Sequence, residues 1–190
     1  MHIIINKESE IPLALDDSIE AITWNISNPI EVHLPSSLRR LYCDYILELP
    51  PLPEGLETLR CQSVEKIKYL PESLTFLSCN SVVRLNKVPS RLTHLFCEHV
   101  LVLKDLPDTL LVLYADGLTK LPKLPTGLIE LSCDNVKYID SVPGGLLHLE
   151  CRKIMEHIYD MPKSLKKAIF GATQYIYVPT KQHKYFSKLD

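Results

Sequence analysis

The sequence predicts a solenoid, a stack of similar coils with a parallel β-sheet along one side and little α-helix. Proline recurs every 18 residues through most of the chain, and leucine stands three and six residues after each of these prolines. The prolines, taken here as position 0 of coils 1 to 7, are Pro35, Pro53, Pro71, Pro89, Pro107, Pro125 and Pro143. A strict period of this kind indicates coils that bury their apolar edges by stacking on their neighbours.

Residues 1–34 are expected to form an N-terminal cap that contains a degenerate repeat. Ile19, Ile22 and Trp24 match positions +3, +6 and +8 of a coil, but the proline is missing. An open solenoid end exposes both the core and a sheet edge, so a terminal coil has to be covered. We therefore expect residues 1–15 to add a covering strand.

Residues 35–161 are expected to form seven repeats with a buried column of small residues. Position +8 is alanine in coil 5, at Ala115, and cysteine in the other six coils, at Cys43, Cys61, Cys79, Cys97, Cys133 and Cys151. Alternation along a strand places this position on the same face as the leucine at +6. Parallel side chains in a reducing compartment disfavour disulfides, and closely spaced Cys or His pairs for zinc are lacking. We expect these thiols to fill the core, and we expect no metal and no cofactor.

The strand segment Leu-x-x-Leu-x-Cys resembles the leucine-rich repeat, over about residues 16–179. The preceding Leu-Pro, as in Leu34-Pro35 and Leu70-Pro71, resembles the Leu-Pro repeats of bacterial secreted effectors and the FNIP repeats of amoebae and giant viruses. This resemblance implies a leucine-rich-repeat solenoid with its parallel β-sheet on the concave face. The chain departs from the family pattern at position +11. Most leucine-rich repeats have there an asparagine whose amide bridges successive coils, whereas this chain has aliphatic residues.

The 18-residue coil leaves no room for a helix on the convex side. That side is expected to be extended, polyproline-like or 3-10, as its prolines favour. A left-handed β-helix is the competing fold, since its triangular coils also contain about 18 residues. The unequal spacing of bulky leucines argues against it.

Residues 162–190 are expected to form a degenerate last repeat, a C-terminal cap and a tail. Pro162 follows Pro143 by 19 residues, and Leu165, Ala168 and Phe170 continue the apolar pattern imperfectly. The segment 175–178 is then expected to close the core.

Composition narrows the classes of function. The net charge of −2 and pI near 6.4 lack the basic excess of a dedicated nucleic-acid binder. No apolar run is long enough for a signal peptide or a membrane span, so we expect an intracellular protein, in the cytoplasm, in a host cytoplasm or nucleus, or in a virion, without a membrane partner. No cysteine or serine stands beside a histidine and an orienting acid as a nucleophile would, so we expect no enzyme.

The candidate site lies at the exposed strand positions +5 and +7. At these positions, coils 3 to 5 are expected to bring five side chains together. We name them the aromatic patch: Phe76, His94, Phe96, Val112 and Tyr114. Rings on a stiff concave surface are typical anchors of protein recognition. Position +9 is acidic in four coils, at Asp44, Glu98, Asp116 and Asp134, and is expected to rim the patch and favour a basic segment of a partner. Alternatively, the rings only stabilise the sheet or form a homodimer contact.

Three hypotheses of function follow. The first is a non-enzymatic interaction module, a monomer or weak homo-oligomer, that a pathogen or giant virus makes to engage a host protein. The second is a structural or virion-associated component that self-assembles. The third is nucleic-acid binding through the basic convex side, which carries Lys66, Lys68, Arg84, Lys87, Lys104, Lys120, Lys123 and Lys137.

Overall fold

The computed structural model describes residues 1–12, 14–136, 138–139, 141–153, 157–158, 162–170, 173–179 and 184–188. For residues 138, 157–158, 170, 173–179 and 184–188 it describes the backbone alone.

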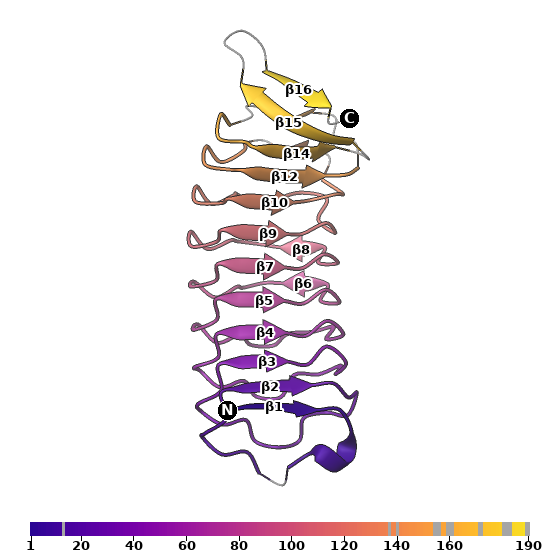
Figure 1. Cartoon of the computed structure of the whole chain (residues 1–190), viewed down its shortest axis with the longest axis vertical. Coiled ribbons are helices and arrows are strands. Elements are labelled where there is room, and N and C mark those ends of the chain that lie inside the picture. The colour runs from indigo at the N-terminus through magenta and orange to yellow at the C-terminus, as the bar shows by residue number, and fades with distance from the viewer. Residues whose placement is uncertain are drawn as a thin grey trace.

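One 12-stranded sheet runs the length of the molecule (Figure 1). Its strands in spatial order are β1 (His2–Ile5), β2 (Ala21–Trp24), β3 (Arg40–Tyr42), β4 (Thr58–Arg60), β5 (Phe76–Ser78), β7 (His94–Phe96), β9 (Val112–Tyr114), β10 (Glu130–Ser132), β12 (His148–Cys151), β14 (Lys167–Phe170), β15 (Thr173–Pro179) and β16 (Lys184–Lys188). Pairing is parallel from β1 to β14 and antiparallel from β14 to β16. Each of coils 1 to 7 contributes one strand at positions +5 to +7.

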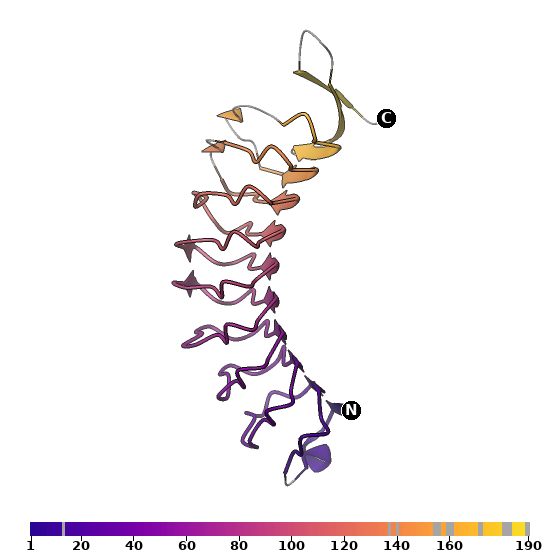
Figure 2. The same cartoon turned by 90° about the vertical axis from the view of Figure 1, so that its left-hand side faces the viewer.

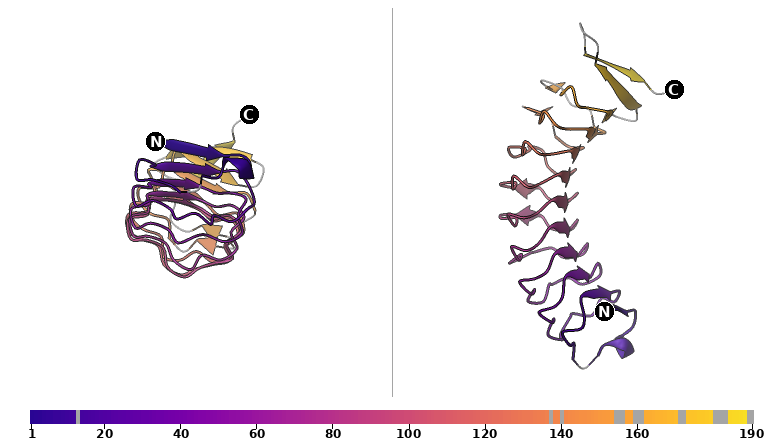
Figure 3. Two further views of the ribbon diagram at one scale, coloured as in Figure 1. Left: turned by 90° about the horizontal axis from the view of Figure 1, so that it is seen from below. Right: turned by 60° about the vertical axis from the view of Figure 1, so that its left-hand side comes forward.

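The strand register follows the repeat, so equivalent positions stack in columns. Leu59 pairs with Leu77, Leu77 with Leu95, and Leu95 with Leu113. Seen along the stack in Figure 3, the coils lie over one another. The leucines at +3 and +6 of all seven coils are at most 1% exposed, which confirms the predicted core face.

The six cysteines and Ala115 form the buried column that the sequence predicts. Each is at most 1% exposed, and the sulfur atoms of Cys133 and Cys151 lie 3.3 Å apart. Burial disfavours the thiolate and raises the pKa of Cys97 to about 12. These thiols therefore act as small core hydrophobes.

The convex side is extended, as expected. It carries short strand pairs, β6 (Arg84–Leu85) with β8 (Val102–Leu103), and β11 (Tyr138–Ile139) with β13 (His157–Ile158). Figure 2 shows these pairs on the outer side of the curve and the long sheet on the inner side. A triangular β-helix would carry strands on every side of each coil, whereas here the concave side alone carries one throughout.

Helix is confined, within the described ranges, to the 3-10 turn η1 (Glu8–Glu10) near the N-terminus. No helix in that part of the chain is long and apolar enough to cross a membrane. At the same end β1 pairs with β2, and Trp24 is buried with its Nε1 donating to the Asn28 carbonyl oxygen at 2.9 Å. The side chains of residues 175–178, expected to close the other end, lie outside the described residues.

Candidate functional site

The aromatic patch lies on three adjacent concave strands, β5, β7 and β9. The register places Phe76 beside His94 and His94 beside Val112, and it places Phe96 beside Tyr114. The leucine between these positions on each strand is fully buried, so the +5 and +7 side chains project from the opposite, concave face. The structure therefore brings together all five residues that the sequence pattern selected.

The rings of the patch pack on one another. The Phe76 ring lies 5.3 Å from that of Phe96 and 6.1 Å from that of His94, between centroids, and the Phe96 ring lies 4.9 Å from that of Tyr114. These separations are typical of favourable aromatic pairs. All five patch residues remain half-buried, so each still presents part of its surface to solvent.

Two hydrogen bonds orient the edges of the patch. The His94 Nδ1 lies 2.9 Å from the Thr93 hydroxyl oxygen. The Tyr114 hydroxyl donates to the Glu130 carboxylate, and this bond, reinforced by burial, raises the pKa of Tyr114 to about 12. Sequence reasoning did not foresee the bond to Glu130, although that residue stands at +5 of the next coil and directly beside the Tyr114 strand.

The +9 column has a structural role that the sequence analysis missed. At four of the six steps from coil 1 to coil 7, a side-chain oxygen at +9 accepts a hydrogen bond from the backbone N–H of the +9 residue one coil later. The acceptor and donor pairs are Gln62 with Asn80 (3.3 Å), Asn80 with Glu98 (3.3 Å), Asp116 with Asp134 (3.2 Å) and Asp134 with Arg152 (2.7 Å). This is a side-chain ladder, displaced by two positions from the asparagine position of the standard repeat. The signal was present in the sequence, because +9 is Asp, Asn, Gln or Glu in coils 1 to 6.

Part of the expected acidic rim is engaged in contacts within the coil stack. The Asp116 Oδ1 atom also accepts from the Ser132 hydroxyl at 2.8 Å, and the Asp44 carboxylate lies 2.8 Å from the Arg60 guanidinium. Among the described residues, the Glu98 carboxylate has neither a hydrogen bond nor an ion pair. Of the two acids assigned to the candidate site, Asp116 thus has its Oδ1 atom engaged within the coil stack, whereas the Glu98 carboxylate is unengaged in the same part of the chain; contact of either with a partner stays a prediction.

The basic residues of the convex side are exposed wherever the structure describes them; Lys137 lies outside that part. Exposed acids are interspersed, including Glu65 and Asp105, and Lys87 pairs with Glu72 at 2.8 Å. Nucleic-acid binding by this side stays a prediction. In the same described portion, no group of three or more His, Cys, Asp and Glu residues could hold a metal ion.

Neither a family model nor a curated protein matches the chain. Solved structures similar to it include those of CroV588 and YopM. The crystal structure of CroV588, described as a circular leucine-rich-repeat protein, aligns with a TM-score of 0.63 and 25% identity over 82% of this chain and 27% of that one. YopM from Yersinia enterocolitica WA-314 aligns with a TM-score of 0.48 and 19% identity over 82% of this chain and 51% of that one. The present chain thus spans well under two thirds of either protein.

The similarity to CroV588, together with the parallel-sheet solenoid itself, confirms the leucine-rich-repeat fold. The narrower resemblance to Leu-Pro and FNIP repeats stays a prediction.

Proposed function

We propose that this chain is a non-enzymatic interaction module that binds a partner protein through the aromatic patch. The observation that carries the proposal is the row of stacked rings of Phe76, Phe96 and Tyr114 on the concave sheet. The core does not require these rings, because the leucines behind them already fill it. Leucine-rich-repeat folds commonly serve as protein-binding scaffolds, which supports the same reading.

Pre-ordered rings suit recognition for an entropic reason. Their side chains already pack on neighbours and on a hydrogen-bonded sheet, so little rotamer freedom is lost when a partner covers them. The free carboxylate of Glu98 borders the patch and would favour a basic group on that partner. A partner with apolar side chains flanked by lysine or arginine fits this surface.

The proposal is tested by replacing Phe76, Phe96 and Tyr114 together with serine. Proteins captured from a host-cell extract by the wild-type chain should be lost, or bind at least about tenfold more weakly, because hot-spot rings each contribute about 2 kcal/mol or more. Each lost ring pair also costs about 0.5–1.5 kcal/mol of folding stability, so thermal denaturation must show that the variant is folded at the assay temperature.

Tyr42→Ser is the matched control. Tyr42 occupies the same +7 column in coil 1, is also half-buried, and lies three coils away from Phe96. Its replacement should leave capture unchanged. If the folded triple variant binds as tightly as wild type, the rings of the patch only stabilise the sheet, and the proposal is refuted.

Self-association is a second candidate, favoured by the N-terminal strand. β1 is the outermost strand of the sheet, so its far edge has no strand partner among the described residues. Met1 and Ile4 there are 59% and 52% exposed. An apolar open edge can pair with another chain. A mass that rises with concentration, and that Ile4→Lys returns to the monomer value, would support assembly; a constant monomer mass would eliminate it.

The proposal also includes the organism from which the partner protein comes. Engagement of a host factor by a pathogen or viral protein rests on the repeat resemblance alone, and the host-cell capture described above is its test.

A further inference from the structure

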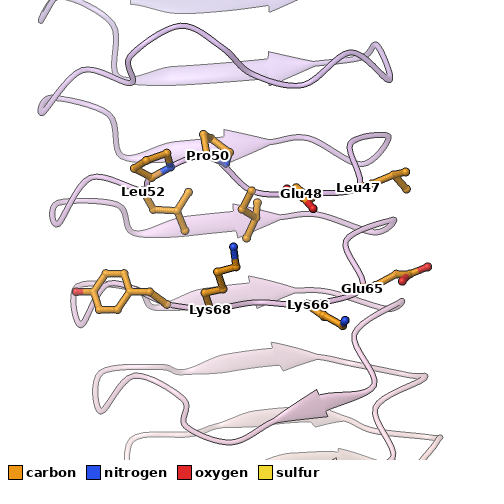
Figure 4. Close-up of a pocket in the computed structure, with 10 residues that line it drawn as sticks. Leu47, Glu48, Pro50, Leu52, Glu65, Lys66 and Lys68 are labelled. Atoms are coloured by element: carbon orange, nitrogen blue, oxygen red, sulfur yellow. The ribbon is translucent and has the colours of Figure 1, made fainter.

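A groove of about 570 Å³ opens on the convex side between coils 1 and 2 (Figure 4). Residues 47–52 of coil 1 form one wall, and residues 65, 66, 68 and 69 of coil 2 contribute to the other. Its volume lies in the range of about 300–1,000 Å³ that is usual for ligand sites. The groove lies on the opposite side of the coil from the aromatic patch.

The convex segments that line the groove are not paired with each other. In coils 3 and 4 the equivalent segments pair as β6 and β8, and the Leu101 N–H donates to the Val83 carbonyl oxygen at 3.0 Å. In coil 1 the equivalent positions are Glu48 and Leu49, and the prolines Pro50 and Pro51, with their fixed φ, follow directly. No backbone hydrogen bond joins residues 47–52 to residues 65–69, all of which the structure describes.

Smaller grooves open at two other places on the convex side. One of about 290 Å³ lies beside Pro122 of coil 5, the repeat equivalent of Pro50, and one of about 160 Å³ lies between coils 2 and 3, where the same repeat position carries Lys68 and Asn86. Gaps therefore open with and without proline at this position, and the gap between coils 1 and 2 has the largest volume of the three.

Six of the ten residues that line the groove at coil 1 are leucine, proline or tyrosine. Leu49 and Leu52 are half-buried and pack against the core, and Leu47 and Tyr69 are 67% and 53% exposed. The Tyr69 hydroxyl donates to both carboxylate oxygens of Glu54, at 2.7 and 2.9 Å, which anchors the ring. An apolar side chain of a ligand would meet a preformed surface here.

The groove carries an acid and a cation in different places. Figure 4 places Glu48 toward the end that carries Leu47, and Lys68 toward the end that carries Leu52. Figure 4 shows the Lys68 side chain reaching toward the segment that carries Pro50 and Leu52, while Glu65 points away from it. Neither Lys66 nor Lys68 forms an ion pair with any residue that the structure describes. An ammonium beside apolar walls favours a carboxylate, since partial removal from water strengthens the attraction.

We propose that this groove binds an extended peptide segment of a partner protein that carries a carboxylate next to apolar side chains. The carboxylate pairs with Lys68, and the apolar side chains cover Leu52 and Tyr69. The peptide backbone bonds to the coil 2 segment, whose amide groups have no backbone partner among the described residues, much as β8 bonds to β6. The charge preference is the reverse of that at the concave patch, so the two surfaces select different segments.

The test uses phage-displayed random linear peptides selected on the full chain. We expect enriched sequences to combine Asp or Glu with apolar residues. A selected peptide, synthesised with a fluorophore and followed by anisotropy, should bind Lys68→Glu at least about tenfold more weakly than wild type. Lys104→Glu is the matched control, because Lys104 is also exposed and stands at the same repeat position but follows the paired strand β8. It should change the affinity less than about twofold.

A peptide with lysine in place of its acidic residue should regain affinity for Lys68→Glu, which separates charge recognition from misfolding. If Lys68→Glu proves unstable in thermal denaturation, Lys68→Gln replaces it. The proposal is overturned if no peptide is enriched, if the enriched peptides lack acidic residues, or if the two charge reversals weaken binding equally. Loss of binding in the triple-serine patch variant would also overturn it, by placing the peptide on the concave face. The other outcomes named here do not bear on the proposal that the aromatic patch on the concave face binds a partner.

Discussion

Gly117→Ala should destabilise the solenoid although it adds a single methyl group. Gly117 stands at +10 of coil 5, where an added Cβ would lie 2.6 Å from the Glu98 carbonyl oxygen and 2.9 Å from that of Val100. The shorter distance is about 0.8 Å below the 3.4 Å at which ordinary contact begins. Both obstacles are backbone atoms of coil 4, so relief requires the coils to separate. Such overpacking typically costs about 1–3 kcal/mol.

Urea denaturation followed by far-ultraviolet circular dichroism measures this cost. Gly144→Ala is the control, because an added Cβ there meets nothing within 4 Å. That change should be neutral or stabilise by up to about 1 kcal/mol, through the lower entropy of the unfolded chain. Equal midpoints for the two variants would refute the tight approach of coils 4 and 5.

Two further predictions concern the core. Leu95→Ala should lower the free energy of unfolding by about 2–5 kcal/mol, as expected for a fully buried leucine, and Lys104→Ala should change it by less than about 0.5 kcal/mol; similar losses in urea denaturation would mean that inward and outward positions are misassigned. Under reducing conditions near pH 8 the six thiols should react slowly with an aqueous thiol reagent in the native protein, because burial raises the pKa of Cys97 to about 12 and blocks access, and all six should react after denaturation. Rapid native labelling of several would place the column outside the core.

The columns of the core could be predicted because each coil repeats the environment of the one before. A residue such as Leu77 meets its counterparts at the same position in coils 2 and 4, so one period describes every contact in the column. Ala115 in place of cysteine indicated packing rather than chemistry, and its burial beside the thiols agrees. The members of the aromatic patch could be selected for the same reason, since parallel register carries +5 and +7 from strand to strand.

The roles of the polar side chains could not be predicted in this way. Asp116 and Glu98 occupy the same repeat position. The Asp116 carboxylate accepts a hydrogen bond from a backbone N–H of the next coil, whereas the Glu98 carboxylate does not. The two side chains differ by one methylene group, and the 18-residue period does not show which of them places an oxygen within reach of that amide. The sequence showed acceptors at +9, but it did not show which of them would find a donor.

By itself, then, the sequence determined the solenoid, its concave strand face and its buried thiol column, because these follow from apolar residues repeated at a fixed interval. The tertiary structure decided how closely successive coils approach. Coils 4 and 5 approach so closely that residue 117 has no room for a Cβ, whereas the convex segments of coils 1 and 2 remain unpaired beside Pro50 and leave a groove. These spacings depend on hydrogen bonding and side-chain packing between neighbouring coils, which the sequence of one repeat does not specify.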